Sequence, residues 1–144
     1  MESIFIILFV GLLGGMTIGM QSPMSSMISQ RIGVLESIFI VHLGGALAVL
    51  IPMLVHGSKL GQWRNVPTYT LFAGVFGLVV VSVMSYMIPR IGITGAMITL
   101  LAGQLIMGTF LDQFGLLGVA IRPMDFTRGL GIGIVILGLW LTVK

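Results

Sequence analysis

The charged residues of this chain are few, and they lie far apart along the sequence. They are Glu2, Arg31, Glu36, Lys59, Arg64, Arg90, Asp112, Arg122, Asp125, Arg128 and Lys144. They leave about five uncharged stretches, most of them near the roughly 20 residues that a helix needs to cross the hydrocarbon core of a bilayer. Because lipid solvates neither ions nor unpaired backbone groups, this spacing predicts an all-α, polytopic membrane protein.

The composition of the 144 residues supports this prediction, because 57% are hydrophobic, 8% are charged and the mean hydropathy is +1.17. A soluble domain carries roughly a quarter charged residues. A chain of this length that crosses a bilayer repeatedly has no room for a soluble catalytic or receptor domain. The 7 Lys and Arg residues exceed the 4 Asp and Glu residues, but they are scattered, so the sequence predicts no nucleic-acid partner.

Five transmembrane helices in a single domain, residues 1–144, are expected from the uncharged stretches and the prolines. Pro67 and Pro89 bound the third helix. Methionines at helical spacing on both sides of Pro23 indicate that helix continues past this proline, either tilted or bent. The expected spans cover residues 4–21, 37–55, 67–87, 93–111 and 126–143.

The last span is short for a membrane crossing, and its start depends on one capping residue. Asp125 is expected to cap the helix that begins at Phe126, and Arg128 and Lys144 can extend their charged ends to the interface. Residues 113–121 are apolar but too few to cross, so they are expected to form an interfacial segment.

The distribution of basic residues between the two ends of the helices is nearly even. An odd number of crossings places the termini on opposite sides, and the count then favours a cytoplasmic N-terminus by about one charge. Two arrangements remain open. One is a pair of oppositely oriented copies, which would reproduce the inverted repeats of many transporters, and the other is a single orientation with a parallel dimer or a monomer.

Few polar side chains fall inside the expected helices, and they are the candidates for substrate binding. Gln104 lies near the middle of the fourth helix, where its amide either contacts a substrate or forms an interhelical hydrogen bond. Gln21 lies near the end of the first helix, and His42 and Ser82 lie about two turns inside the next two helices. His42 can also be a core histidine with its hydrogen bonds satisfied.

A stripe of small residues, Gly11, Gly15 and Gly19, lies along the first helix. Such a stripe lets two helix backbones approach closely, either for packing or for sliding during alternating access.

Glu36 and Asp112 are the candidates for an ion pair or for coupling to protons. Glu36 lies at the start of the second helix, where the helix dipole favours an acid. Asp112 lies at the end of the fourth helix, the unfavourable end of the dipole, so it is expected to pair with Arg122 or Arg128.

The sequence contains no constellation that indicates an enzyme. It has 0 Cys, no H-E-x-x-H zinc motif and no G-x-S-x-G turn, and its two histidines are far apart. We therefore expect no catalytic residues, no metal and no cofactor. A lipid-modifying activity centred on His42 and Glu36 is the least favoured hypothesis.

Several short motifs resemble one known family. They are Pro89-Arg90-Ile91-Gly92, Gly103-Gln104, Asp112, Phe114-Gly115-Leu116-Leu117-Gly118, Arg122-Pro123, Gly131 and Gly138, with Gln21 and Gly44 in the N-terminal half. On these residues the chain resembles, over its whole length, the YdcZ-type family of bacterial inner-membrane exporters, in the drug/metabolite transporter superfamily. The resemblance implies a multi-pass protein of the bacterial inner membrane, with five helices that form one half of a ten-helix transporter and assemble into a dimer.

Two departures limit what the resemblance implies. Ser25 stands where the family has an asparagine, and residues 3–30 lack the acid that the smaller multidrug members of the superfamily carry in their first helix. Proton-coupled export of cations by that acid is therefore not expected.

The leading functional hypothesis is a secondary transporter or exporter of small molecules that works by alternating access. Its partners would be membrane lipid, a small-molecule substrate and a second subunit, either a second copy of the chain or a homologue. The alternative is a structural subunit that does not transport and packs against a larger membrane partner.

Overall fold

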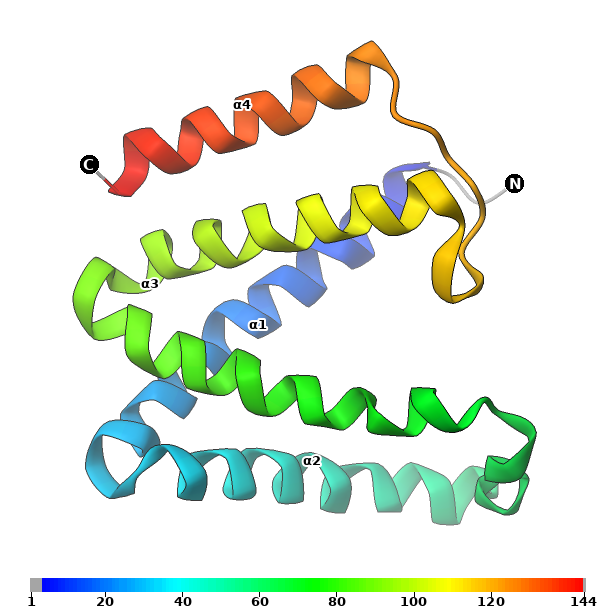
Figure 1. Ribbon diagram of the computed structural model, residues 1–144. Coiled ribbons are helices and arrows are strands. Elements are labelled where there is room, and N and C mark those ends of the chain that lie inside the picture. Colours follow the sequence, from blue (N-terminus) through cyan, green and yellow to red (C-terminus); the bar gives the residue numbers. More distant parts are fainter. Residues whose placement is uncertain (1–3, 144) are drawn as a thin grey trace. The chain divides into compact units, whose positions relative to one another are not determined.

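The computed structural model describes residues 4–143, and all the secondary structure in this range is helical (Figure 1). The elements are α1 (Ile4–Ile32), α2 (Val34–His56), the 3₁₀ helices η1 (Leu60–Asn65) and η2 (Thr68–Phe72), α3 (Ala73–Phe114), the 3₁₀ turn η3 (Leu116–Gly118) and α4 (Phe126–Val143). The expected all-α class is confirmed.

Within residues 4–143, four helical stretches are long and apolar enough to cross a membrane: Ile4–Ile32, Val34–His56, Thr68–Phe114 and Phe126–Val143. The third stretch contains a break, because Gly92 has φ 73° and ψ 170°. This conformation lies outside the helical region and is essentially restricted to glycine. Gly92 therefore divides α3 into two helical segments, which correspond to the third and fourth expected helices.

The observed boundaries differ from the expected ones mainly in the first two helices. The expected first span ends at residue 21, and helix continues past Pro23 to Ile32, as the methionine spacing predicts, because the proline removes only one backbone donor. In α2, helix begins at Val34 instead of residue 37. The third expected span begins as 3₁₀ helix at Thr68 and becomes α-helical at Ala73. α4 begins and ends where the sequence predicts.

The chain divides within α3 into two compact units, the first ending at Tyr86 and the second beginning at Met87. In the first unit α1 and α2 are joined by a single residue, Gly33, with φ 120° and ψ 157°. A side chain is rarely tolerated at this φ, so glycine permits the abrupt reversal between the two helices. This reversal brings the end of α1 against the start of α2.

The buried positions of the first unit are mostly hydroxyl-bearing. They are Ser22, Ser25, Ser26, Ser37, Ile38, Met84 and Ser85. Long apolar side chains face outward instead, and Leu54, for example, is 84% exposed. A soluble protein shows the reverse arrangement. Hydrocarbon chains can cover an apolar surface, whereas polar groups must find partners inside the protein, so this distribution is that of a membrane protein.

In the second unit, the connection from α3 to α4 is held by hydrogen bonds to the end of α3. The backbone N–H of Arg122 donates to the carbonyl oxygen of Asp112 at 2.8 Å, and that of Met124 donates to Oε1 of Gln113 at 2.7 Å. Residues 113–121 contain the last two residues of α3, Gln113 and Phe114, and η3, which is three residues long. Asp125 Oδ1 accepts from the N–H of Arg128 at 2.7 Å, which confirms the expected cap of α4.

Candidate functional site

The second unit contains a cavity of about 390 Å³, lined by both polar and apolar side chains, which we call the Gln104 cavity. This volume lies within the range of small-molecule binding sites. The cavity is lined by Gln104, Leu105, Gly108, Thr109 and Asp112 of α3 and by Arg128, Gly131, Ile132 and Val135 of α4. It thus brings together two of the residues that the sequence singled out, Gln104 and Asp112.

Helical spacing explains why these residues share one cavity. Gln104, Gly108 and Asp112 are four residues apart, so they lie one above another on one face of α3. A Cβ atom added at Gly108 or at Gly131 would meet no neighbouring atom within 4 Å. These two glycines therefore leave open space between the amide of Gln104 and the ionic groups near the end of α3.

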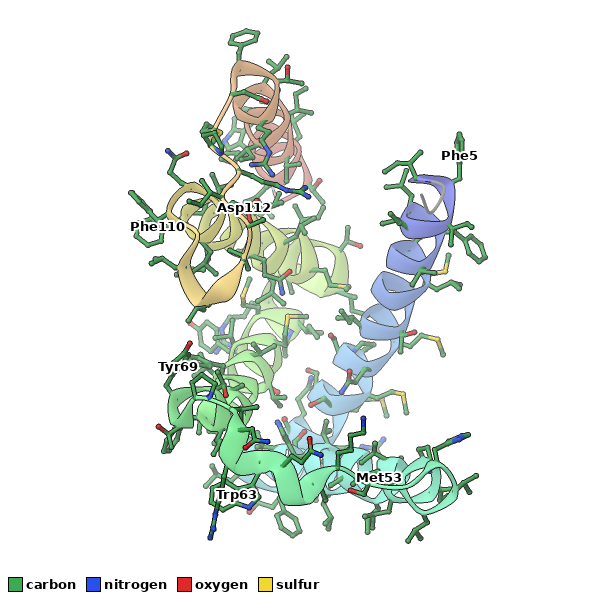
Figure 2. The ribbon with its side chains drawn as sticks, turned by 90° about the vertical axis from the view of Figure 1, so that its right-hand side faces the viewer. Phe5, Met53, Trp63, Tyr69, Phe110 and Asp112 are labelled. Carbon is green, nitrogen blue, oxygen red and sulfur yellow. The ribbon has the colours of Figure 1, made fainter. Side chains whose placement is uncertain are left out.

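The ion pair of the cavity joins Asp112, labelled in Figure 2, to Arg128, one of its two expected partners. The distance from Arg128 Nη2 to Asp112 Oδ2 is 2.9 Å, and the two side chains are 36% and 31% exposed. Arg128 Nη1 also donates to the carbonyl oxygen of Arg122 at 2.8 Å. Because guanidinium presents donors in a fixed fork, one side chain fastens the end of α3 and the following connection to the start of α4.

Gln104 makes no side-chain hydrogen bond to any residue in the range 4–143. The interhelical hydrogen bond that was the alternative interpretation is therefore not present in this part of the chain. Transfer of an amide from water into the hydrocarbon region costs free energy unless a hydrogen-bond partner replaces the water. Gln104 lines the cavity two turns along α3 from Asp112.

The first unit has a groove between α1 and α2 with a volume of about 430 Å³, and Gln21 lines it. Ser25 of α1 and Gly44 and Gly45 of α2 line the same groove. The rest of its wall is formed by Thr17, Met20, Met24, Ile28, Ile40 and Val41. Gln21 therefore lies in a groove that is more apolar than the Gln104 cavity.

A cluster of serine hydroxyls lies next to this groove and was not among the sequence candidates. Ser25 Oγ and Ser37 Oγ are 3.0 Å apart, and Ser37 Oγ donates to the carbonyl oxygen of Ser25 at 2.8 Å. Ser29 Oγ and Ser85 Oγ are 2.7 Å apart, which links α1 to α3. The available signal was the spacing of Ser22, Ser25, Ser26 and Ser29, which places four hydroxyls on one face of α1.

We expect Ser37→Ala to lower the free energy of unfolding by about 1–2 kcal/mol, because it removes both hydrogen bonds between Ser37 and Ser25 inside a buried cluster. Thermal unfolding in detergent measures the effect. Ser82→Ala is the matched control, since Ser82 Oγ donates only to Leu78 of its own helix, at 2.8 Å. Equal stability of the two variants would show that the cluster does not hold α1 to α2.

His42 and Ser82 line neither the Gln104 cavity nor the groove. His42 Nδ1 lies 2.8 Å from the carbonyl oxygen of Ile38, one turn earlier in α2. Its Nε2 faces α3, where a Cβ atom added at Gly77 would lie 2.5 Å from it. The imidazole thus packs on a glycine of α3 with one nitrogen satisfied locally, as in a structural histidine.

The remaining candidates have simple local surroundings. Within residues 4–143 Glu36 makes no ion pair, and its carboxylate lies against Gly33 at the start of α2. A Cβ atom added at Gly11 or Gly15 would meet no atom within 4 Å, so the glycine stripe of α1 is uncovered there, while Gly19 is partly exposed. No group of three or more His, Asp or Glu side chains in the described range is arranged to hold a metal ion.

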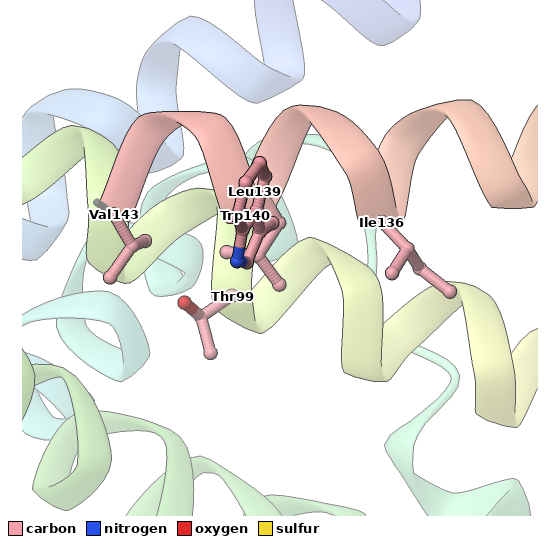
Figure 3. Close-up of a pocket in the computed structure, with 5 residues that line it drawn as sticks. All are labelled: Thr99, Ile136, Leu139, Trp140 and Val143. Carbon is pink, nitrogen blue, oxygen red and sulfur yellow. The ribbon is translucent and has the colours of Figure 1, made fainter.

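A larger cavity in the second unit, of about 550 Å³, is almost entirely apolar (Figure 3). Its lining consists of Thr99 of α3 and of Ile136, Leu139, Trp140 and Val143 of α4. Thr99 Oγ1 already donates to the carbonyl oxygen of Gly95 at 2.8 Å. This cavity presents no charged or amide group, so its chemistry suits hydrocarbon and it does not compete with the Gln104 cavity as a polar site.

Comparison with known proteins places the chain in a family. Neither the curated proteins nor the solved structures gave a match. One family model matches residues 6–141, which is nearly the whole chain, and its description is "Putative inner membrane exporter, YdcZ". This match confirms the resemblance, and its description indicates export across the membrane. The chain therefore belongs to the YdcZ family of inner-membrane exporters, as a multi-pass protein of the inner membrane.

Proposed function

We propose that this protein exports a small molecule and binds it in the Gln104 cavity. The observation that carries the proposal is an amide without a hydrogen-bond partner in residues 4–143, in the same cavity of about 390 Å³ as an ion pair two helical turns away. Polar groups are costly inside a bilayer, and those that occur there commonly mark substrate paths. Gln104 and Asp112 lie on the same face of α3 and would contact the two ends of a bound molecule.

The cavity also indicates the chemistry of its substrate. Gln104 offers both a donor and an acceptor, and Asp112 and Arg128 offer opposite charges without net charge. Leu105, Ile132 and Val135 supply apolar walls. A neutral or zwitterionic molecule with polar groups at its ends and an apolar middle satisfies all of these surfaces. A strongly charged molecule would leave its charge without a counter-ion.

The length of α3 supports five membrane crossings in place of four. Its 42 residues would extend for about 63 Å as one helix, twice the roughly 30 Å of a hydrocarbon core. The break at Gly92 makes two crossings out of one helix. Together with α1, α2 and α4 these give five crossings in a single transmembrane domain, with the termini on opposite sides of the membrane.

Five crossings would make the chain one half of a ten-helix transporter, so the working unit is proposed to be a dimer. The second subunit is another copy or a homologue, and the near balance of basic residues at the two sides permits a parallel or an antiparallel pair. Alternating access then follows from rocking of one bundle against the other. Gly11 and Gly15 are uncovered and Gly19 is partly exposed, so this stripe would allow close approach of a neighbouring helix during the motion.

A panel of metabolites tested for ligand-dependent thermal stabilisation checks the proposed site. We expect at least one polar or zwitterionic compound to stabilise the protein, and Gln104→Leu to weaken its binding about 3- to 10-fold through loss of a hydrogen bond. Gln21→Leu is the matched control, because Gln21 lines the groove of the first unit. A compound whose affinity falls only with Gln21→Leu would place the site in that groove instead.

A further inference from the structure

We propose that the connection between α2 and α3 binds the phosphate headgroup of an anionic phospholipid. A cavity of about 450 Å³ lies between the last turns of α2 and η1. The candidate spans on either side of this connection end at His56 and begin again at Thr68. These boundaries put residues 57–67 at the level of the lipid headgroups, where a phosphate is always close.

Four of the exposed polar side chains that line this cavity are Lys59, Gln62, Trp63 and Asn65. None of them makes a side-chain hydrogen bond to a residue in the range 4–143. The backbone beneath them is nevertheless fixed, because the N–H of Gln62 donates to the carbonyl oxygen of Lys59 at 2.9 Å and the N–H of Leu60 donates to Ser58 Oγ at 3.1 Å. An ammonium, an indole N–H and two amides thus remain as donors on an ordered turn, which suits phosphate oxygens.

Within residues 4–143, the two cations of this connection, Lys59 and Arg64, form no salt bridge with a carboxylate. The sequence contains no Asp or Glu between Glu36 and Asp112. Arg64 lies with its guanidinium carbon 5.3 Å from the ring centre of Trp63, which positions the cation without neutralising it. Lys59 and Arg64 therefore give this short connection two uncompensated positive charges. In a membrane the anions nearest to such charges are lipid phosphates.

An apolar wall next to the donors distinguishes a lipid from free phosphate as the occupant. Met53 of α2 and Leu60 and Val66 of the connection line the same cavity (Figure 2 labels Met53 and Trp63). Leu60 is 67% exposed and Trp63 is 50% exposed. A phospholipid covers this wall with its glycerol and upper acyl carbons while its phosphate meets the donors, whereas inorganic phosphate would leave the wall uncovered.

Quenching of Trp63 fluorescence by brominated lipids tests the proposal on the full-length protein. Trp140→Phe leaves Trp63 as the single tryptophan of the chain. The nanodiscs contain a small fraction of either brominated phosphatidylglycerol, which is anionic, or brominated phosphatidylcholine, which is zwitterionic. From the quenching we expect a roughly 10-fold stronger apparent affinity for phosphatidylglycerol than for phosphatidylcholine. The Lys59→Gln/Arg64→Gln double variant should reduce this preference to near unity. Arg31→Gln, which removes a cation at the end of α1, should keep it.

Three results would overturn the proposal. Equal quenching by the two brominated lipids would show that the site does not recognise the headgroup, and this comparison requires no charge variant. Full reversal of the preference by excess inorganic phosphate at constant ionic strength would identify a site for a free anion. An unchanged preference in the double variant would place the recognition elsewhere. Because the readout needs neither substrate nor flux, its outcome is independent of the proposed export.

Discussion

Replacing Arg128 with leucine is expected to lower the free energy of unfolding by about 2 kcal/mol. The guanidinium joins Asp112 to the carbonyl oxygen of Arg122 at 2.9 Å and 2.8 Å, and no neutral side chain can make both contacts. The expected loss lies at the lower end of the range for hydrogen bonds to charged groups, because solvent screens an ion pair whose two members are about one-third exposed. Thermal unfolding in detergent gives the measurement.

Arg128→Lys is the matched control for this prediction. Lysine keeps the positive charge opposite Asp112 but lacks the planar fork that also reaches Arg122. An intermediate loss of stability is therefore expected. Equal losses for the leucine and lysine variants would show that the bond to the Arg122 carbonyl carries the effect, and no loss in either would contradict the role assigned to the ion pair.

Gly92→Ala is expected to destabilise the protein by about 1–3 kcal/mol, because the backbone at this position adopts a conformation that is nearly restricted to glycine. Its φ is 73° and its ψ is 170°, so an added Cβ is strained whatever space surrounds it. The break of α3 depends on this residue. The effect is measured as the loss of thermal stability together with the helical content of the purified protein.

Gly103→Ala serves as the control, because it is expected to stabilise the protein, whereas Gly92→Ala is expected to destabilise it. Gly103 lies inside α3, and an added Cβ there would meet no atom within 4 Å. Alanine is favoured over glycine in a helix by up to about 1 kcal/mol. If Gly92→Ala were as stable as Gly103→Ala, the division of α3 at Gly92 would be wrong.

The sequence predicted the elements whose signals are local. The ends of α4 agree with the prediction because Asp125 is a capping residue directly before an apolar stretch, and its carboxylate makes the expected bond. The methionine spacing predicted that helix continues past Pro23, and α1 does so, but the span was placed to end at residue 21 whereas the helix runs to Ile32. A proline lacks a donor but does not force a helix to stop when the neighbouring turns remain paired.

The candidate site was less predictable because its contacts join residues distant in sequence. The charge of Asp112 predicted an ion pair, but the choice between Arg122 and Arg128 depends on the path of residues 115–125. The serine cluster depends on the reversal at Gly33, which brings Ser37 back to Ser25. Hydroxyls in a membrane helix often bond to their own backbone, as Thr109 does, so their sequence positions alone did not indicate a cluster.

Substrate flux across reconstituted proteoliposomes is the most direct test of the central claim, which is export of a small molecule bound in the Gln104 cavity. For a compound that stabilises the purified protein, we predict flux into or out of proteoliposomes above that of empty vesicles. Gln104→Leu should reduce this flux, and Gln21→Leu should reduce it less. Flux that Gln104→Leu leaves unchanged while the variant remains folded would remove the cavity from the transport path. No flux for any stabilising compound would contradict export and favour a structural subunit.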